Sequence, residues 1–218
     1  MPYLLEPDAY ALLSENGIPV PKYRLVRNGE EAERAAAEIG YPVAMKIVSE
    51  DILHKSDVGG VKLAVQNGAE ARAAFQDLMA AAQKTVPGGR HKGVLVTQMV
   101  EGGVETIIGL GMDPEFGPFL MFGLGGIHVE IFKDVSFRLV PLSREHARDM
   151  VDEVKSSVLL KGYRGNPPKN LEALIDLIMA VSKMSVANPD IQEMDLNPVI
   201  VREEGALAID ARILRQRG

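Results

Sequence analysis

The sequence predicts a mixed fold of the α/β or α+β class, built as two lobes. Strand and helix patterns alternate along the first half of the chain, whereas hairpin-like strands dominate the second half. With 218 residues, the chain is long enough to bury a sizeable core and slightly long for one average domain. We therefore expect one lobe over residues 1–97 and a second lobe, with a mostly antiparallel sheet, over residues 98–218.

The first half begins with a helix predicted over Glu6–Glu15, which Asn16-Gly17 ends as a C-terminal stop signal. The prolines of Ile18–Pro21 favour an extended segment, because proline biases the residue before it away from helix. The elements expected next are a strand at Tyr23–Val26, a helix at Glu30–Ile39, a strand at Val43–Val48, a loop at Ser49–Gly60, a strand at Val61–Val65 and a helix at Ala69–Lys84.

The second half is predicted to consist of short strands, two helices and a terminal hairpin. The strands are expected at Val94–Val96, Thr106–Gly111, Phe119–Phe122, Val129–Phe132 and Phe137–Val140. The helices are expected at Arg144–Leu159 and Asn170–Ser185, and the hairpin strands at Gln192–Val201 and Ala206–Ile213. The glycines of 123–126 do not form a phosphate loop, because neither a GxxxxGK[ST] nor a complete GxGxxG pattern is present.

The composition is that of an ordinary globular protein, with 46% hydrophobic and 25% charged residues. A net charge of -6 argues against nucleic-acid binding, and the lack of long basic runs argues against a polybasic membrane patch. The sequence contains no cysteine, which excludes disulfides, thiolate metal sites and cysteine nucleophiles. No apolar stretch approaches the roughly 20 residues of a membrane-spanning helix, and the N-terminus lacks a signal-peptide pattern. We therefore expect a cytoplasmic protein.

Polar and apolar side chains alternate along the first strand of the terminal hairpin. Glu193, Asp195 and Asn197 fall on every second position, so they are expected to project from one face of the strand. The apolar side chains of Met194 and Leu196 take the other face. A solvated acidic strand face would show the same alternation, so the pattern alone does not establish a site.

The register of this hairpin adds a metal-binding interpretation. A turn centred between Glu203 and Glu204 places Asn197 directly opposite Asp210. Directly opposed side chains lie about 4.5–5.5 Å apart at Cβ, so an amide oxygen and a carboxylate can share one hard cation. Mg²⁺ typically takes one or two carboxylates together with substrate phosphates. A nucleotide-bound Mg²⁺ site and a solvated strand face both remain open at this point.

Lys46 stands near the end of an apolar strand, where its charge must either reach water or meet an anion. A strand-borne lysine that contacts a nucleotide phosphate is a recurring device in phosphoryl transfer. A lysine at a strand end is, however, more often simply solvated.

His54 belongs to the predicted loop and precedes Asp57 by three residues. A carboxylate at this spacing can fix the tautomer of the imidazole, which leaves the other ring nitrogen free to act as a nucleophile toward phosphorus. Gly59 and Gly60 would let the backbone approach a ligand closely and let the loop flex. Taken alone, a single loop histidine is more often a surface residue than a catalyst.

Seven segments in a fixed order cover nearly the whole chain and resemble one family. These segments are Tyr41–Lys46, Leu53–Val61, Asp113–Pro118, Phe122–Gly126, Gly162–Gly165, Glu193–Val199 and Ala208–Arg212. Together they resemble the ATP-grasp β subunit, or β-type domain, of ADP-forming acyl-CoA synthetases (acetate–CoA ligase, ADP-forming). The resemblance implies an ATP-grasp fold, in which two lobes enclose a nucleotide cleft.

The resemblance also implies a reaction and a partner. Acyl-CoA, ADP and phosphate are converted reversibly into a carboxylic acid, CoA and ATP, with Mg²⁺ as cofactor. A CoA-binding α subunit, in an α₂β₂ assembly, forms the acyl phosphate and passes the phosphoryl group on through a histidine of its own. A β-subunit histidine on a mobile loop, matched here by His54, receives the group and delivers it to ADP.

Position by position, the resemblance implies a set of site residues. The catalytic positions are His54, Asp57 and Lys46. The positions that contact the nucleotide are Lys46, Gly59, Gly60, Gln98, Met99, Val100, Glu105 and Arg138. The Mg²⁺ ligands are Asn197 and Asp210, which agrees with the hairpin register obtained from the strand pattern alone.

Three alternatives are weighed against this interpretation. A carboxylate–amine or carboxylate–thiol ligase of the wider ATP-grasp group would form an acyl phosphate directly from ATP and would not need His54. A succinyl-CoA-synthetase-like subunit is the second alternative. A non-catalytic nucleotide-sensing module of a larger assembly would have no chemical need for Lys46, His54, Asn197 and Asp210 together.

Overall fold

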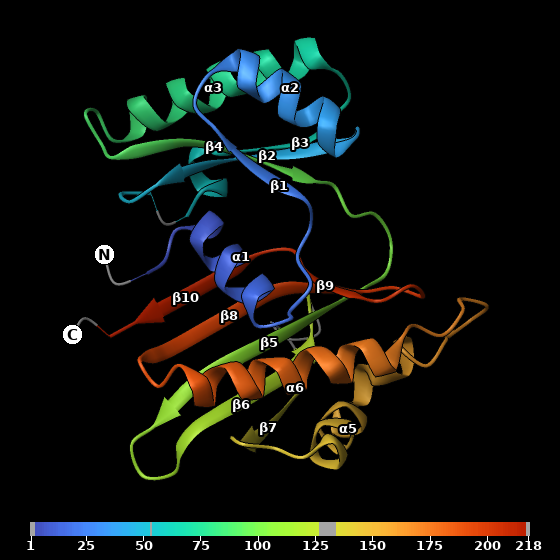
Figure 1. Ribbon diagram of the computed structural model, residues 1–218. Helices are drawn as coiled ribbons and strands as arrows, with labels where there is room; N and C mark the ends of the chain where they lie inside the picture. Colours follow the sequence, from blue (N-terminus) through green and yellow to red (C-terminus); the bar gives the residue numbers. More distant parts are fainter. Residues whose placement is uncertain (1–2, 53, 127–133, 217–218) are drawn as a thin grey trace. The chain divides into compact units, whose positions relative to one another are not determined.

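The computed structural model describes residues 3–52, 54–126 and 134–216, and its helices and strands form a mixed α+β fold, as expected (Figure 1). The chain divides into two compact units. The first unit is Pro21–Val100, and the second is Glu101–Gly218 together with Pro2–Val20. The sequence-based division after residue 97 grouped the N-terminal segment with the first lobe, whereas here that segment belongs to the second unit.

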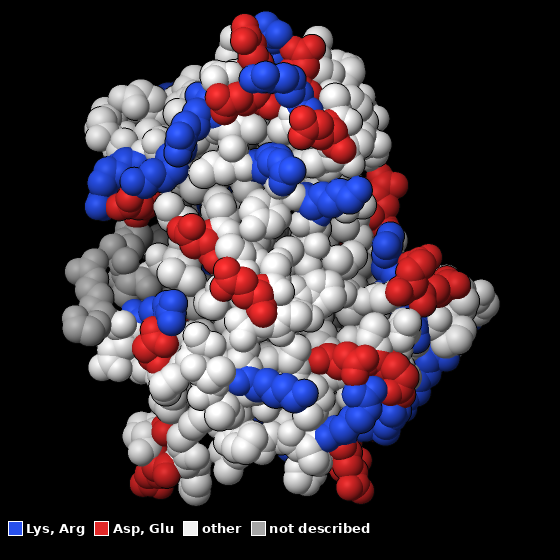
Figure 2. Space-filling view, in the orientation of Figure 1, with Lys and Arg blue, Asp and Glu red and all other residues white. Residues whose placement is uncertain are grey.

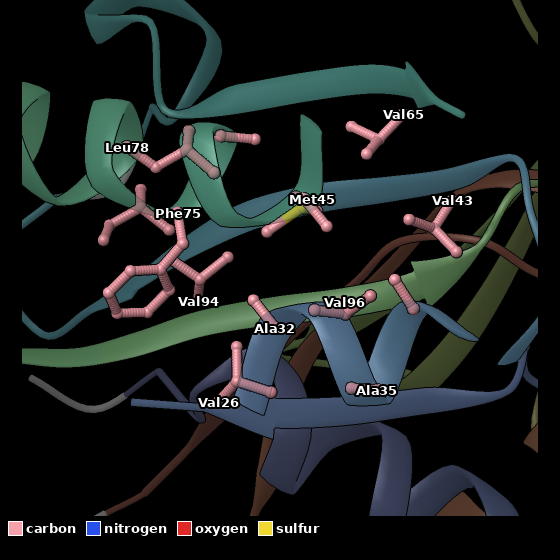
Figure 3. Close-up of a cluster of buried hydrophobic side chains, with 14 of the residues drawn as sticks. Val26, Ala32, Ala35, Val43, Met45, Val65, Phe75, Leu78, Val94 and Val96 are labelled. Atoms are coloured by element: carbon pink, nitrogen blue, oxygen red, sulfur yellow. The ribbon is translucent and has the colours of Figure 1, made fainter. Parts of the chain in front are cut away.

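The first unit is a four-stranded antiparallel sheet with two helices on one face (Figure 1). Its strands are β1 (Tyr23–Val26), β2 (Val43–Ser49), β3 (Val61–Val65) and β4 (His91–Gln98), in the order β1-β4-β2-β3. Its helices are α2 (Gly29–Ile39) and α3 (Gly68–Thr85). Figure 3 shows the core between these layers, where Phe75 and Leu78 of α3 meet Met45 of β2 and Val94 and Val96 of β4.

The same local signal starts both helices of the first unit. The Asn28 side chain accepts a hydrogen bond from the backbone nitrogen of Glu31 at 2.9 Å, and the Asn67 side chain accepts one from Glu70 at 3.0 Å. The carboxylates of Glu31 and Glu70 reach back to the backbone nitrogens before each cap at 2.8 Å. The bond to each asparagine satisfies a backbone donor that the first turn of the helix leaves without a partner, and the returning carboxylate fixes the residue before the cap.

The second unit contains a larger antiparallel sheet, in the order β10-β8-β5-β6-β7, with β9 paired to β8. The strands are β5 (Val104–Asp113), β6 (Gly117–Leu124), β7 (Val135–Leu139), β8 (Ile191–Val201), β9 (Ala206–Ala208) and β10 (Ala211–Arg215). The antiparallel C-terminal sheet expected from the sequence is therefore present. Strands β5 and β6 are both longer than expected, because their pairing continues up to the turn at Asp113–Gly117.

Helices α5 (Arg144–Glu153) and α6 (Leu171–Ala187) pack against each other and against strands of this sheet, and α1 (Glu6–Glu15) packs against β10. The single helix expected at Arg144–Leu159 is wrong, because α5 ends at Glu153 and a short 3₁₀ helix, η2 (Lys155–Leu159), follows. The Asp134 carboxylate explains the interruption, since it accepts hydrogen bonds from the backbone nitrogens of Lys155 at 3.0 Å and Ser156 at 2.7 Å.

The N-terminal segment joins the second unit through β10. Tyr3 forms a bridge with Leu214, and the Leu4 backbone nitrogen donates to the Ile213 carbonyl oxygen at 2.8 Å. These bonds extend the sheet edge by a short antiparallel stretch and place α1 beside β10. The strand expected at Val129–Phe132 lies outside the described residues.

Acidic and basic side chains are interspersed over the face of the molecule in Figure 2, without a broad basic patch on that face. This distribution agrees with the net charge of -6. Within the described ranges, none of the helices has the length and the apolar character needed to span a bilayer.

Candidate functional site

The terminal hairpin has the register expected from the sequence. Val199 pairs with Ala208 and Leu196 pairs with Ala211, so Asn197 and Asp210 occupy facing positions between these two pairs. The hairpin is not continuous, because the second strand is interrupted at residues 209 and 210, between β9 and β10. Asn197 is exposed and Asp210 is partly buried. The interruption places both side chains where the regular sheet ladder stops.

The interruption next to Asp210 is held by hydrogen bonds from three directions. The Ala208 backbone nitrogen donates to the Pro19 carbonyl oxygen at 2.9 Å, and the Ile209 nitrogen donates to the Pro198 carbonyl oxygen at 2.9 Å. The hydroxyl of Tyr10, which is fully buried on α1, donates to the carbonyl oxygen of Ile209. The backbone on the N-terminal side of Asp210 is therefore fixed before any ligand binds.

Asp210 and Tyr10 each have a further contact that ties them to their surroundings. One carboxylate oxygen of Asp210 accepts from the backbone nitrogen of Ala211 at 2.8 Å. The Tyr10 hydroxyl also lies 3.1 Å from the carboxylate of Glu6, which is buried in the first turn of α1. Neither Glu6 nor Tyr10 was a candidate from the sequence. Their spacing of one helical turn was a visible signal, but only the pairing of α1 with the hairpin gives it meaning.

The alternation predicted along β8 is confirmed. Met194 and Leu196 are buried, whereas Glu193 and Asn197 are exposed and Asp195 is partly buried. Burial raises the pKa of the Asp195 carboxyl, an effect that the facing Arg212 opposes and that the charges of Asp210 and Glu193 reinforce. The face that carries Asn197 therefore also carries the carboxyl groups of Glu193 and Asp195, with Arg212 facing Asp195.

The predicted loop between β2 and β3 carries His54, which is exposed, and contains a short 3₁₀ helix, η1 (Ser56–Val58). Asp57 lies in η1 and is also exposed. Among the described residues, no hydrogen bond or ion pair joins His54 to Asp57, so the tautomer-fixing contact expected from their spacing is not formed in this structure. The catalytic roles of both residues stay predictions.

Gly59 and Gly60 serve two different structural purposes. Gly59 ends η1 with a φ of 68°, in the left-handed region that favours glycine. At Gly60 a Cβ atom would lie 2.7 Å from Cγ2 of Ile47 and 2.8 Å from the carbonyl oxygen of Lys55. The chain at Gly60 therefore packs closely against its own strand and loop. The proposed lining of a nucleotide loop by these glycines stays a prediction.

Lys46 lies in the middle of β2, not near the end of a strand as the sequence suggested, because pairing with β4 continues to Ser49. Its side chain is 7% exposed. Met45 and Ile47, its neighbours in the strand, belong to the core under α2 and α3, so Lys46 projects from the opposite face of the sheet. A buried ammonium group requires compensating polar or charged partners, which makes Lys46 a functional candidate and not a solvated strand-end charge.

The segment expected to contact adenine, residues 98–100, begins at the last residue of β4. The backbone nitrogen of Gln98 donates to the Lys22 carbonyl oxygen at 2.8 Å, and that of Met99 lies 3.4 Å from the Pro42 carbonyl oxygen. Val100 is the last residue of this segment and also of the first unit. The predicted contacts with adenine would therefore use backbone groups of a segment that β1 and the start of β2 hold in place.

Glu105 lies near the start of β5, and its side chain is exposed. Its carbonyl oxygen accepts from the backbone nitrogen of Gly125 at 2.8 Å. A Cβ atom on Gly125 would lie 3.0 Å from Cβ of Glu105. This close approach gives a packing reason for the glycine cluster that the sequence analysis found at 123–126, and it fixes the backbone that carries Glu105.

Arg138 lies on β7 in the second unit, and its guanidinium is 2.7 Å from the Glu153 carboxylate of α5. Arg138 faces Leu120 across the ladder, and Leu120 is fully buried. Asp195, in contrast, is on the sheet face of Gly109 and Met121, the other side from Leu120. The structure therefore brings Arg138 to α5 and not to the hairpin residues, and its expected phosphate contact stays a prediction.

The donor chemistry of the hairpin fits Mg²⁺. Asn197 offers an amide oxygen and Asp210 a carboxylate, and both are hard oxygen donors of the kind that Mg²⁺ selects. No group of three or more His, Asp or Glu side chains suited to a metal is present in the described ranges 3–52, 54–126 and 134–216. A pair of protein ligands is the usual number for a Mg²⁺ that also binds waters and substrate phosphates.

A family model for the ATP-grasp domain matches residues 2–214 of the chain. Taken with the two α+β units and the hairpin that carries Asn197 and Asp210, this match defines the class of protein, and the chain belongs to the ATP-grasp family. Within that family it groups with the β subunits of ADP-forming acetate–CoA ligases, as the following relatives show.

The chain is 48% identical over 211 residues to subunit beta of the ADP-forming acetate–CoA ligase I of Pyrococcus furiosus, with 97% of this chain and 91% of that protein covered. It is 47% identical over 207 residues to the ADP-forming acetate–CoA ligase I of Archaeoglobus fulgidus. That match covers 95% of this chain but only 30% of the longer relative. The β subunit is thus a separate chain in one relative and part of a longer chain in the other.

Solved structures of the acetyl-coenzyme A synthetase 1 of Ca. Korarchaeum cryptofilum are also similar. One, in complex with coenzyme A, Ca-AMPCP and HgCl+, superposes with a TM-score of 0.95 at 46% identity, covering 98% of this chain and 93% of that chain. A second contains a phosphorylated phosphohistidine segment in a site I orientation, with a TM-score of 0.92 at 44% identity and the same coverage of 98% and 93%. A third, with Mg-AMPPCP, has its phosphohistidine segment pointing towards the nucleotide binding site, with a TM-score of 0.87, 45% identity and coverage of 98% and 93%.

Proposed function

We propose that the chain acts as the nucleotide-handling β subunit of an ADP-forming acetate–CoA ligase and transfers a phosphoryl group between His54 and ADP. The observation that carries this proposal is the segment between β2 and β3, which presents His54 exposed between two ends that are fixed to the sheet. Residues 50–52 and 54–60, the described part of this loop, are named the His54 segment below. Solved structures of relatives contain a phosphohistidine segment, which in one of them points towards the nucleotide binding site, and this supports phosphoryl transfer through a histidine.

The transfer step balances without any further reactant. A ring nitrogen of His54 attacks the γ-phosphorus of ATP, the new N–P bond forms, and the bond from phosphorus to the bridging oxygen breaks to release ADP. In the other direction, a terminal oxygen of ADP attacks the phosphohistidine phosphorus and the N–P bond breaks. Because little covalent chemistry falls to the protein, positioning and charge neutralisation supply most of the rate.

Residues of each unit are assigned to the nucleotide. Lys46 binds phosphate oxygens from the sheet of the first unit, and Gln98, Met99 and Val100 meet adenine through backbone groups. Glu105 contacts the ribose. Asn197 and Asp210 would hold Mg²⁺, which offsets phosphate charge when bound.

The partner that completes the reaction is a CoA-binding α subunit, and the expected assembly is α₂β₂. The name of the Pyrococcus relative as subunit beta supports a partner of this kind. The acyl group is then chosen by the partner, because this chain is assigned only the nucleotide and the phosphoryl group. A cytoplasmic location, expected from the sequence, also stays a prediction.

Labelling of the chain by ATP tests the proposal. Wild-type protein incubated with its α partner, Mg²⁺ and γ-labelled ATP is expected to gain acid-labile, base-stable label on His54. His54→Ala should abolish the label, whereas His146→Ala, at an exposed position on α5, should retain it. A label that survives in His54→Ala, or that never appears in the wild type, contradicts the proposal.

A further inference from the structure

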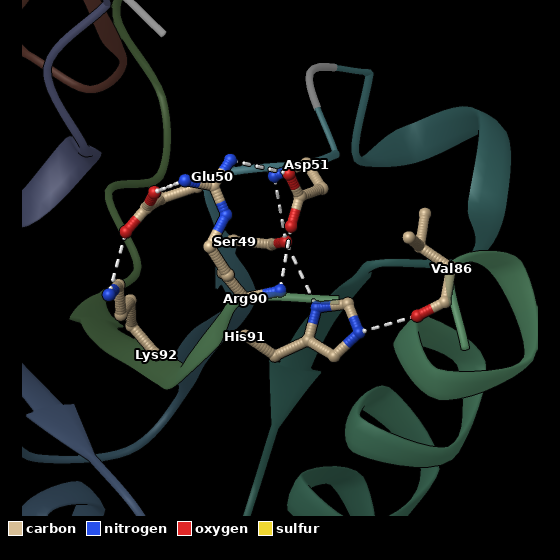
Figure 4. A network of polar contacts seen from close by, with 7 residues as sticks. All are labelled: Ser49, Glu50, Asp51, Val86, Arg90, His91 and Lys92. Atoms are coloured by element: carbon tan, nitrogen blue, oxygen red, sulfur yellow. Dashed lines mark hydrogen bonds and ion pairs between the residues drawn. The ribbon is translucent and has the colours of Figure 1, made fainter. Parts of the chain in front are cut away.

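The start of the His54 segment lies beside the start of β4. Strand β2 ends at Ser49, which pairs with His91 of β4, so residues 49–51 run alongside residues 90–92 (Figure 4). None of the residues 90–92 was a candidate from the sequence. They nevertheless make most of the polar contacts that hold the entry to the segment.

Arg90 contacts the segment through its backbone and its side chain at once. Its backbone nitrogen donates to Oδ2 of Asp51 at 2.6 Å, and its guanidinium donates to Oδ1 of the same carboxylate at 2.8 Å. The guanidinium also lies 2.6 Å from the Glu50 carboxylate, whose other oxygen is 2.6 Å from Nζ of Lys92. The Glu50 backbone nitrogen closes the arrangement by donating to the Arg90 carbonyl oxygen at 3.2 Å.

A second chain of hydrogen bonds, through His91 and Ser49, accompanies these three ion pairs. The Val86 carbonyl oxygen can only accept, so Nε2 of His91, 3.1 Å away, carries a hydrogen and donates. Nδ1 of the same ring lies 2.9 Å from the hydroxyl oxygen of Ser49. The Ser49 oxygen in turn accepts from the Asp51 backbone nitrogen at 3.1 Å. Asp51 is therefore connected through a buried serine to the end of α3 (Figure 4).

The far end of the segment is fixed to the same sheet. The Ile47 backbone nitrogen donates to the Gly60 carbonyl oxygen at 2.9 Å, and the Gly60 nitrogen donates to the Lys55 carbonyl oxygen at 2.7 Å. The segment is therefore attached at its start to Arg90, next to β4, and at its end to Ile47 of β2. The exposed His54 lies between these two attachments.

The geometry points to Arg90 as a positioning residue for phosphoryl transfer at His54. By holding both oxygens of Asp51, Arg90 fixes the entry of the His54 segment and so helps to set the position from which His54 reacts. This inference rests on the proposed function, because it assigns Arg90 a part in that same transfer. Arg90 touches neither substrate nor nucleotide in this account and acts only through the segment.

The exposure of the Arg90, Glu50 and Asp51 side chains shows that the ion pairs of Arg90 are not needed mainly for stability. The side chain of Arg90 is 58% exposed and those of Glu50 and Asp51 are 26% and 25% exposed. Ion pairs this accessible to water contribute little to the free energy of unfolding. Misplacing a reacting group by about 1 Å, in contrast, can reduce a rate by about 100-fold. Loss of the Arg90 contacts should thus affect the reaction far more than the fold.

A matched pair of variants tests the inference. Arg90→Met keeps the aliphatic stem and removes the guanidinium, and Arg90→Lys keeps the charge but loses the two-pronged geometry. Arg72→Met is the control, because Arg72 forms a comparably exposed pair with Glu33 in the same unit, away from the segment. The measurements are the single-turnover rate of His54 labelling, the nucleotide Kd, the thermal unfolding midpoint and amide hydrogen exchange over residues 50–60.

Arg90→Met is expected to lower the labelling rate by about 10- to 100-fold and to speed exchange in the segment, with the nucleotide Kd unchanged. Arg90→Lys should recover part of the rate, and Arg72→Met should leave rate and exchange at wild-type values. The inference is overturned by an unchanged rate and exchange in Arg90→Met, or by an equal loss in Arg72→Met. Hydrogen exchange distinguishes the two proposals: if His54 is never labelled but exchange still rises in Arg90→Met, the relay fails while the anchoring of the segment stands.

Discussion

Asn197 and Asp210 face each other across the terminal hairpin, at the place where the second strand is interrupted. The pairs on both sides, Leu196 with Ala211 and Val199 with Ala208, share one register. The amide oxygen of Asn197 and the carboxylate of Asp210 can therefore bind the same cation. The backbone before Asp210 is fixed by the hydrogen bonds of Ala208 and Ile209. This relationship is the structural basis for assigning Mg²⁺ to the second unit.

The first prediction concerns the metal ligand itself. Asp210→Asn should weaken Mg²⁺-dependent ADP binding by about 10-fold or more, because it removes the one full negative charge of the pair. Binding measured without metal should change little. Calorimetry with and without Mg²⁺ provides the measurement, and Asp190→Asn, which breaks an ion pair with Arg215, is the control. An equal loss with and without metal would show that Asp210 has only a structural role.

The second prediction concerns the residue behind the ligand. Tyr10→Phe removes the hydroxyl that donates to the Ile209 carbonyl oxygen and leaves that partly buried oxygen without this donor. We expect a loss of about 1–3 kcal/mol in the free energy of unfolding and a roughly 10-fold weaker Mg²⁺-dependent binding of ADP. Tyr163→Phe, at an exposed position, serves as the control for both measurements.

Urea unfolding and calorimetry separate the two effects of Tyr10→Phe. If stability falls while Mg²⁺-dependent binding by the folded protein stays at the wild-type value, Tyr10 supports the fold but does not position Asp210.

The third prediction compares the two glycines of the His54 segment. Gly60→Ala would force a Cβ atom to 2.8 Å from a backbone oxygen that cannot move without disturbing the segment. We expect a destabilisation of about 1–3 kcal/mol. Gly59→Ala meets no atom within 4 Å and bears only the strain of its positive φ, about 1 kcal/mol. Denaturant unfolding should rank Gly60→Ala as the more harmful change, and the opposite ranking would contradict the described packing.

The fourth prediction is a pH dependence centred on Asp51. Hydrogen bonds from the side chain and backbone of Arg90 lower the pKa of the Asp51 carboxyl in the folded protein. A lowered folded-state pKa stabilises the fold above the ordinary carboxyl pKa, and this contribution is lost as the pH falls through the lowered value. Because the pair is accessible to water, Asp51→Asn should be only slightly less stable than wild type near neutral pH, and it should match wild type in strong acid.

Thermal unfolding of both proteins across the acid range measures this difference. A gap between wild type and Asp51→Asn that stays constant down to strongly acidic pH would show that the Asp51–Arg90 pair does not carry the effect.

Local features of the fold were predictable because they depend on local chemistry. The register of the hairpin followed from its turn, which the Arg202 nitrogen closes by donating to the Gly205 carbonyl oxygen at 2.8 Å. The alternation along β8 followed from period-2 side-chain directions. The interruption at residues 209 and 210 was not predictable, since it depends on α1, whose Tyr10 comes from the other end of the chain.

The features missed in the first unit have the same origin. Lys46 was expected at a strand end because the apolar run stops soon after it, but pairing with β4 extends the strand to Ser49. Asp51 and Arg90 are 39 residues apart in sequence, and no periodicity connects them. Their contact arises only when β2 and β4 pair. Sequence patterns thus indicate which residue types serve the chemistry, while tertiary pairing determines what holds them in place.

The most direct test of the relay through His54 is the exchange of labelled ADP into ATP by the assembled protein, with neither CoA nor a carboxylic acid present. The account predicts exchange that requires Mg²⁺ and that His54→Ala abolishes, because a phosphohistidine can form from ATP and return its phosphoryl group to ADP without any acyl substrate. Exchange that appears only when acid and CoA are added, or that persists in His54→Ala, would contradict it and would favour direct formation of an acyl phosphate from ATP.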